Sequence, residues 1–250
     1  MSTDLFEYGL RLGDDALIAA QRMAEWSTRA PEMEEDIALS NIALDQLGVA
    51  RLMLSYAGEV EGAGRDEDAL AYLRDAGEFR NVLLVEQPNG DFAVTIARQF
   101  LYAALVAPFW RALASSRDET LASIAAKAEK EAVYHLRHAS EWLIRLGDGT
   151  AESHARAQAA LDELWMYTGE LFEIDAIERG LAQRGIAVDP QGLRPEWDET
   201  IDRVLAEATL ARPPEQWMQT GGRAGRHSEH LGFILADLQF LQRAYPGANW

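Results

Sequence analysis

The sequence predicts an all-α protein built as an antiparallel bundle of long helices. Apolar residues recur at three- and four-residue spacing almost throughout the chain, and no alternating pattern of useful length predicts a strand. The 250 residues are 48% hydrophobic and 26% charged, so they have enough apolar surface to form one large core. We therefore expect a single domain over residues 1–250.

Proline and glycine residues mark the boundaries that separate the first two long helices from the rest of the chain. Ala30-Pro31 starts the second helix, because a proline at an early helical position loses no hydrogen bond. The stretch from Gly58 to Gly64 ends that helix. The connection from Glu59 to Asp91 is then longer than a simple helical hairpin needs.

Two further long helices are joined by a tight turn. The third helix begins near Asp91, after the turn Pro88-Asn89-Gly90, and ends around Ser115. Ser116-Arg117-Asp118-Glu119 has capping-box spacing and starts a fourth helix, which runs to Leu146 before a glycine-rich stop. The short turn predicts that these two helices are antiparallel.

Three more helices are predicted in the C-terminal part of the chain. A fifth long helix covers Ala151 to Arg184, and a shorter one runs from Pro195 to about Leu210. After the Pro213-Pro214 break and the glycine-rich run Gly221 to Arg226, a final helix begins at about His227.

The order helix pair, long crossover, helix pair is that of a ferritin-like bundle, in which a crossover joins the second and third core helices. The predicted fold class is therefore an all-α, ferritin-like antiparallel helical bundle with additional C-terminal helices.

Composition excludes several classes of function. The 23 basic and 41 acidic residues give a net charge of -18, which repels phosphate backbones, so no nucleic-acid partner is expected. The absence of cysteine excludes disulfides, iron–sulfur ligation, thiolate zinc sites and a cysteine nucleophile, and it fits a reducing cytoplasm. The longest apolar run, residues 100–110, is too short to cross a bilayer of roughly 30 Å, so we expect a buried helix and no membrane partner.

A ferritin-like bundle can hold two irons on two lone glutamates and two Glu-x-x-His pairs, since residues at i and i+3 share a helix face. None of the five histidines of this chain has a glutamate three residues before it. The residues at that position before His135, His138, His154, His227 and His230 are Ala132, His135, Ala151, Ala224 and His227, respectively.

Weaker patterns remain. Glu131 and His135 share a helix face at i, i+4 and could bind a metal, but a simple helix pair is the plainer interpretation. His227 and His230 imply no third zinc ligand. Two sets of residues on the predicted helices are expected to be surface acids and core or interface aromatics rather than site residues: Asp162, Glu163, Glu170, Glu173 and Asp175, and Trp26, Trp110, Trp142 and Trp165.

The glycine-rich run carries Arg223 and Arg226 ahead of a helix start, where backbone amides and guanidinium groups could contact a ligand phosphate. It lacks the Lys-Ser/Thr end of a Walker A sequence, and an interhelical turn is the alternative interpretation.

Specific segments spread over Tyr8 to Trp250 resemble the C subunits of bacterial phenylacetyl-CoA epoxidases. The most specific is Asn81 to Gly90 followed by the spaced Lys130 to His135. The other segments are Arg11-Leu12-Gly13-Asp14, Leu44 to Arg51, Gly185 to Pro190 and Glu229-His230-Leu231-Gly232.

The resemblance implies a subunit of a multicomponent monooxygenase that converts phenylacetyl-CoA to its ring-1,2-epoxide in aerobic phenylacetate breakdown. In that family a ferritin-like A subunit holds the di-iron centre and the substrate and pairs with the C subunit. A separate flavin and iron–sulfur reductase supplies electrons from NADPH. No cofactor is expected in the C-type chain itself.

The resemblance also explains the missing ligand pair. The corresponding helix of the catalytic subunit looks like Lys-Glu-Glu-x-x-His, and its second Glu and its His bind iron. Here that Glu position is Ala132, whereas His135 remains; the second core helix offers Asp45 to Arg51 and no histidine. The chain alone is therefore expected to be a non-catalytic scaffold that stabilises the A subunit. The alternatives are a self-sufficient di-iron oxidase or iron-binding protein, and an acyl-CoA-binding module that uses Arg223 and Arg226.

Overall fold

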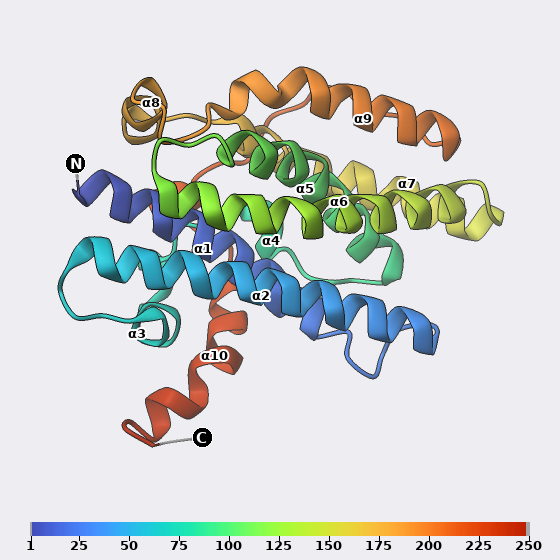
Figure 1. The fold of residues 1–250 in the computed structure, drawn as a ribbon. Helices are drawn as coiled ribbons and strands as arrows, with labels where there is room; N and C mark the ends of the chain where they lie inside the picture. The colour runs from blue at the N-terminus through green and yellow to red at the C-terminus, as the bar shows by residue number, and fades with distance from the viewer. Residues whose placement is uncertain (1, 249–250) are drawn as a thin grey trace. The chain divides into compact units, whose positions relative to one another are not determined.

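The computed structural model describes residues 2–248, and these residues form helices and loops without a strand (Figure 1). Their contacts group into two compact units. The first comprises Met1–Gln87 and Gly221–Trp250, and the second comprises Pro88–Thr220. The prediction of one domain over residues 1–250 stays a prediction.

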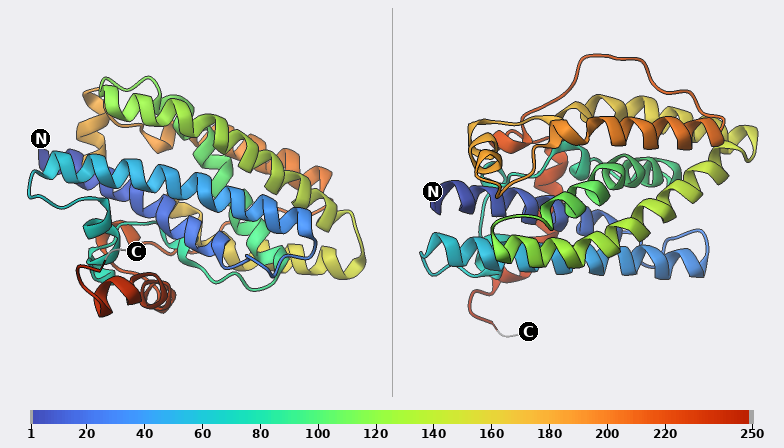
Figure 2. Two further views of the ribbon diagram at one scale, coloured as in Figure 1. Left: turned by 60° about the horizontal axis from the view of Figure 1, so that its bottom comes forward. Right: turned by 45° about the horizontal axis from the view of Figure 1, so that its top comes forward.

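The first unit is organised around two long antiparallel helices, α1 (Ser2–Ala24) and α2 (Met33–Glu61) (Figure 2). Gly13 allows them to approach closely, because a Cβ at this position would lie 2.8 Å from Cδ2 of Leu54. α2 ends at Gly62, whose φ of 69° is the left-handed conformation that favours glycine. The predicted end of this helix within residues 58–64 is confirmed.

Three shorter helices complete the first unit: α3 (Glu67–Tyr72), α4 (Leu83–Glu86) and α10 (Glu229–Ala244). The first two lie in the long crossover, which is therefore structured rather than a plain loop. Nε2 of Gln239 on α10 donates to the backbone oxygens of Ala71 (3.0 Å) and Arg74 (2.9 Å). These bonds fix the C-terminal helix to the end of α3.

The second unit contains the other predicted helix pair, α5 (Phe92–Leu113) and α6 (Glu119–Gly147). Asp91 and Asp118 cap the two helices, because their carboxylates accept from the amides of the first turns. The predicted bounds of the third and fourth helices are confirmed to within a few residues.

The prediction of one long helix from Ala151 to Arg184 is wrong. The chain forms α7 (Ala151–Leu164), two 3-10 turns over residues 165–172, and α8 (Ala176–Gln183). The hydroxyl of Thr168 donates to the backbone oxygen of Trp165 at 2.8 Å, which closes a local turn, and Asp175 caps a new helix. Short-range polar bonds therefore interrupt a segment whose apolar spacing predicts a continuous helix.

A cluster of aromatic rings forms part of the core of the second unit. Trp197 on α9 (Arg194–Glu207) is fully buried, and its indole donates to the backbone oxygen of Leu101 at 3.1 Å. Its ring centroid lies 5.6 Å from that of Trp165 and 5.3 Å from that of Phe172. Such ring pairs stabilise a core beyond the area they bury.

Candidate functional site

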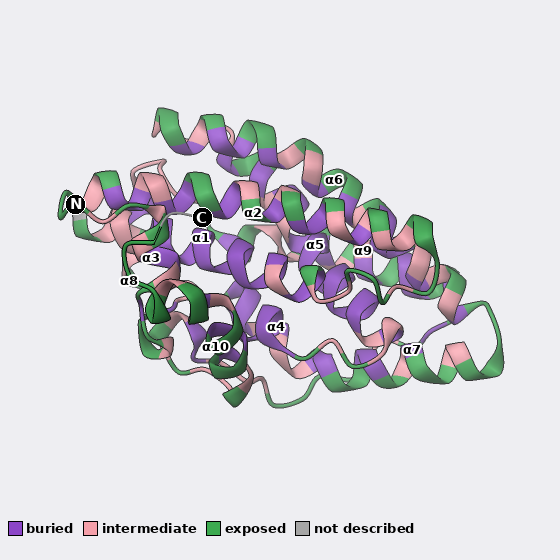
Figure 3. Cartoon of the chain, turned by 90° about the horizontal axis from the view of Figure 1, so that it is seen from below, coloured by how far each residue is buried: buried purple, intermediate pink, exposed green. Residues whose placement is uncertain are grey.

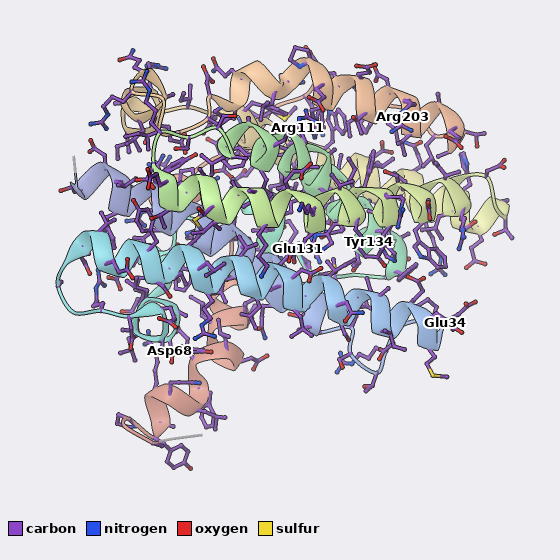
Figure 4. The ribbon with its side chains drawn as sticks, viewed as in Figure 1. Glu34, Asp68, Arg111, Glu131, Tyr134 and Arg203 are labelled. Carbon is purple, nitrogen blue, oxygen red and sulfur yellow. The ribbon has the colours of Figure 1, made fainter. Side chains whose placement is uncertain are left out.

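The residues at the predicted metal-ligand positions lie on α6, as the sequence predicts. Ala132 and His135 are both buried, and their i, i+3 spacing places them on one helix face. Glu131 also lies on α6 (Figure 4), where a carboxylate oxygen is 3.8 Å from Nζ of Lys127. The position next to His135 that would need a carboxylate therefore holds only a methyl group.

The surroundings of His135 are aromatic. Its ring centroid lies 6.2 Å from that of Tyr134, which in turn lies 6.1 Å from that of His138. Among residues 2–248 no group of three or more His, Asp or Glu side chains could hold a metal ion. The residues present do not fit the di-iron ligand set that the resemblance describes for the catalytic subunit.

Arg223, one of the two predicted phosphate contacts, is held inside the first unit. Its guanidinium forms a bidentate ion pair with Asp15, at 2.7 and 3.0 Å, and donates to the backbone oxygens of Arg11 (3.3 Å) and Arg80 (2.8 Å). A ligand phosphate would have to displace this carboxylate. Arg226, the other candidate, is exposed.

Arg223 belongs to a buried ionic network that sequence reasoning missed. Asp14 and Arg74 are both almost completely buried and form a two-pronged ion pair, with Nη1 of Arg74 3.0 Å from Oδ2 of Asp14. The same Oδ2 accepts from the backbone amide of Arg80 at 2.8 Å, and Asp15 accepts from that of Val82 at 2.8 Å. Two adjacent acids of α1 thus anchor the crossover segment in front of α4.

Glu86 is the second centre of the network. Its carboxylate accepts from Asn81 Nδ2 (2.9 Å) and from the backbone amide of Ser228 (2.6 Å), and lies 2.8 Å from Nδ1 of His227. Nε2 of His227 faces the backbone oxygen of Phe79 at 3.0 Å. The imidazole of His227 therefore bridges the carboxylate of Glu86 and the backbone oxygen of Phe79.

Asp15 is a buried acid of this network. Burial raises the pKa of its carboxyl from the ordinary value of 3.8 to about 6, and the Arg223 guanidinium opposes the rise. At neutral pH the carboxyl is ionised and pairs with Arg223.

Two of the segments that carry the resemblance contain acids of this network. Asp14 and Glu86 lie inside two of the quoted segments, and His227 lies two residues before a third. The sequence does contain a sign of these buried pairs, namely acidic residues within apolar stretches, as at Asp14-Asp15 and in Leu83 to Glu86. Charged side chains are rarely buried without a partner, so an acid in such a stretch indicates a buried ion pair. These residues join α1, the crossover segment and the start of α10 within the first unit.

The first unit also has an apolar surface, which lies on α2. Large apolar side chains are exposed there, including Leu44 at 64% and Leu47 at 45%. α2 and α5 are both long and apolar enough to span a membrane by length and composition alone, a test that core helices of soluble proteins also pass. Exposed apolar surface of this extent typically marks an interaction site.

Comparison with known proteins agrees with the resemblance. The sequence model of a family described as "Phenylacetic acid catabolic protein" matches residues 1–250. The C subunit of the 1,2-phenylacetyl-CoA epoxidase of Escherichia coli (strain K12) is 52% identical over 246 residues, which cover 98% of this chain and 99% of the relative. The family has a ferritin-like helical fold, so the predicted fold class is confirmed. The chain belongs to the phenylacetic acid catabolic protein family.

Proposed function

We propose that this chain is the non-catalytic structural subunit of a phenylacetyl-CoA epoxidase of aerobic phenylacetate catabolism, working in the cytoplasm. It pairs with the catalytic A subunit, which holds the di-iron centre, and stabilises that subunit. The relationship to the C subunit of an epoxidase over nearly the whole length of both chains supports this assignment. Electrons reach the complex through a separate reductase, so the chain needs no cofactor of its own.

The observation that carries the proposal is the alanine at position 132. A di-iron centre requires several carboxylates to balance the charge of two cations, and an imidazole alone does not replace them. His135 has no carboxylate three residues before it, and Glu131 lies near Lys127. The role left to α6 is therefore packing, with a buried histidine where the family's catalytic subunit binds iron.

Co-expression with the A subunit tests the proposal. We expect the two chains to purify together, with iron and epoxidation of phenylacetyl-CoA dependent on the A subunit. The chain purified alone should contain no stoichiometric iron. Iron at two atoms per chain together with oxygenase turnover by the chain alone would show that it is a self-sufficient di-iron enzyme.

Ala132→Glu provides a matched variant. It restores one Glu-x-x-His pair on α6, but residues 45–51 of α2 still offer no histidine. We expect this variant to remain without stoichiometric iron when purified alone, measured by metal analysis. Iron binding by this variant would mean that the chain lacks only the glutamate at position 132. No iron binding would mean that the whole site is altered.

Isothermal calorimetry with phenylacetyl-CoA addresses the acyl-CoA-binding alternative. The isolated chain should release no binding heat, because Arg223 is already paired with Asp15. Saturable binding that Arg226→Ala abolishes would instead favour a coenzyme site at the glycine-rich run.

A further inference from the structure

The first unit carries a continuous apolar groove between α1 and α2. It consists of two adjoining hollows of about 270 and 280 Å³, and both are lined by Leu17 of α1 and Leu47 of α2. One hollow extends past Ala20 and Ala24 toward the start of α2, and the other extends toward Tyr72 of α3. We call this feature the α1–α2 groove.

A stripe of exposed apolar side chains runs along α2 and includes two residues of the groove lining, Leu44 and Leu47. Met33, Ile37, Leu44 and Leu47 are all exposed, and at 3.6 residues per turn they fall on one side of the helix. Gly48 lies beside them, and a Cβ placed on it would have no atom within 4 Å. The stripe therefore has a gap that a side chain of a packed partner helix can enter, as a knob enters a hole.

Exposed acids lie at the start of α2 and at the far end of the groove. Exposed Glu32 and Glu34 lie at the start of α2, and exposed Asp68 lines the groove at the other end (Figure 4). Arg51, the cation in the groove, is 3.2 Å from Glu67, so its charge is balanced there. A partner that matches this pattern is apolar in its middle and basic at both ends.

Charge also disfavours the other possible occupants. A second copy of this chain, which carries a net charge of -18, would place acidic ends against acidic ends in either helix direction. An anionic lipid surface would repel the same carboxylates. The remaining possible occupant is a helix of a different protein.

We propose that the α1–α2 groove receives a helix of the catalytic A subunit that is apolar along one face and basic at both ends. This inference rests on the proposed function, and it adds the surface and the chemistry of the contact. The apolar face of the incoming helix fills the groove, and its terminal cations meet Glu34 and Asp68. This is the helix-in-groove mode of recognition.

The test measures the affinity of the full chain for the A subunit. Leu44→Asp combined with Leu47→Asp should weaken binding at least tenfold, because it places charge in the apolar part of the groove. Phe233→Asp is the matched control, since Phe233 is 65% exposed on α10 of the same unit and lies outside the groove. The control should bind within twofold of the unaltered chain.

A photoreactive amino acid at position 44 gives a second readout that does not depend on a disruptive change. It should crosslink to the A subunit, whereas the same group at position 233 should not. Circular dichroism and thermal unfolding confirm that each variant is folded.

Charge reversal sharpens the test. Glu34→Lys and Asp68→Lys together should lower the affinity several-fold at low salt, and the difference should shrink as salt is raised. Asp237→Lys on α10, an exposed acid away from the groove, should have a smaller effect.

The outcomes separate the inference from the function on which it rests. If the unaltered chain does not bind the A subunit, the proposed function fails. If it binds and the groove variants bind equally well, the inference alone is overturned. Dimerisation of the chain through this face, or its flotation with phospholipid vesicles, that is lost in the Leu44 and Leu47 variant would likewise overturn it.

Discussion

α2 and α5 are almost equally apolar and yet play different parts in the structure. Their most apolar stretches have a mean hydropathy of 1.3 and 1.5, but 44% of that stretch is buried in α2 and 78% in α5 (Figure 3). α5 is packed by α6, α7 and α9 within its own unit, whereas α2 is packed by α1 and α3. The apolar composition of a helix thus indicates that its surface is to be buried, but it does not indicate whether the same chain or a partner buries that surface.

The largest expected effect lies on α5. Phe100 is completely buried there, so Phe100→Ala should lower the free energy of unfolding by about 3–5 kcal/mol through lost burial and a cavity. Urea unfolding of the purified chain measures this loss. Leu44→Ala on α2 is the matched change at an exposed apolar site, and equal losses at the two positions would contradict the distinction between the helices.

A similar contrast holds for charges. Asp14→Ala leaves the buried guanidinium of Arg74 without its carboxylate and should cost about 3–5 kcal/mol in unfolding experiments. Arg111→Ala breaks the exposed pair with Glu196 (Arg111 is labelled in Figure 4) and should cost less than about 1 kcal/mol. A small loss at Asp14 would show that the network contributes little to stability.

The pH dependence of stability tests Asp15. Its folded-state pKa of about 6 exceeds the ordinary 3.8, so between these values the folded state binds more protons than the unfolded state. Raising the pH through this window should lower the contribution of Asp15 to the free energy of unfolding by roughly 3 kcal/mol, with no further change above it. Asp15→Asn should remove this part of the slope, and identical slopes in both proteins would refute the assignment.

The smallest expected effect is at the surface of α2. Leu44→Ser should change the free energy of unfolding by no more than about 0.5 kcal/mol, since an exposed side chain loses little packing. The same variant should be more soluble when the chain is purified without its partner, as measured by light scattering. A stability loss comparable to that of Phe100→Ala would mean that this face is part of the core.

Much of the fold can be predicted from the sequence, because it depends on interactions between residues that are close together in the chain. Asp91 and Asp118 act as caps within four residues of their own helices, so the bounds of α5 and α6 follow from short-range bonds. The absence of a Glu-x-x-His pair can also be established from the sequence alone, because the spacing of the two ligands lies within one helix.

Tertiary structure decided the features that join distant segments. Nothing near Arg223 in the sequence predicts its ion pair with Asp15, which lies 208 residues away. The exposure of Leu44 was equally hidden, since helical spacing shows that a residue is apolar but not whether a neighbour covers it. The sequence alone determined the extents of α5 and α6 and the lack of a Glu-x-x-His pair, because these depend on residues within one or two turns of a single helix. Partners brought together by folding decided which charges are buried and which apolar face remains open.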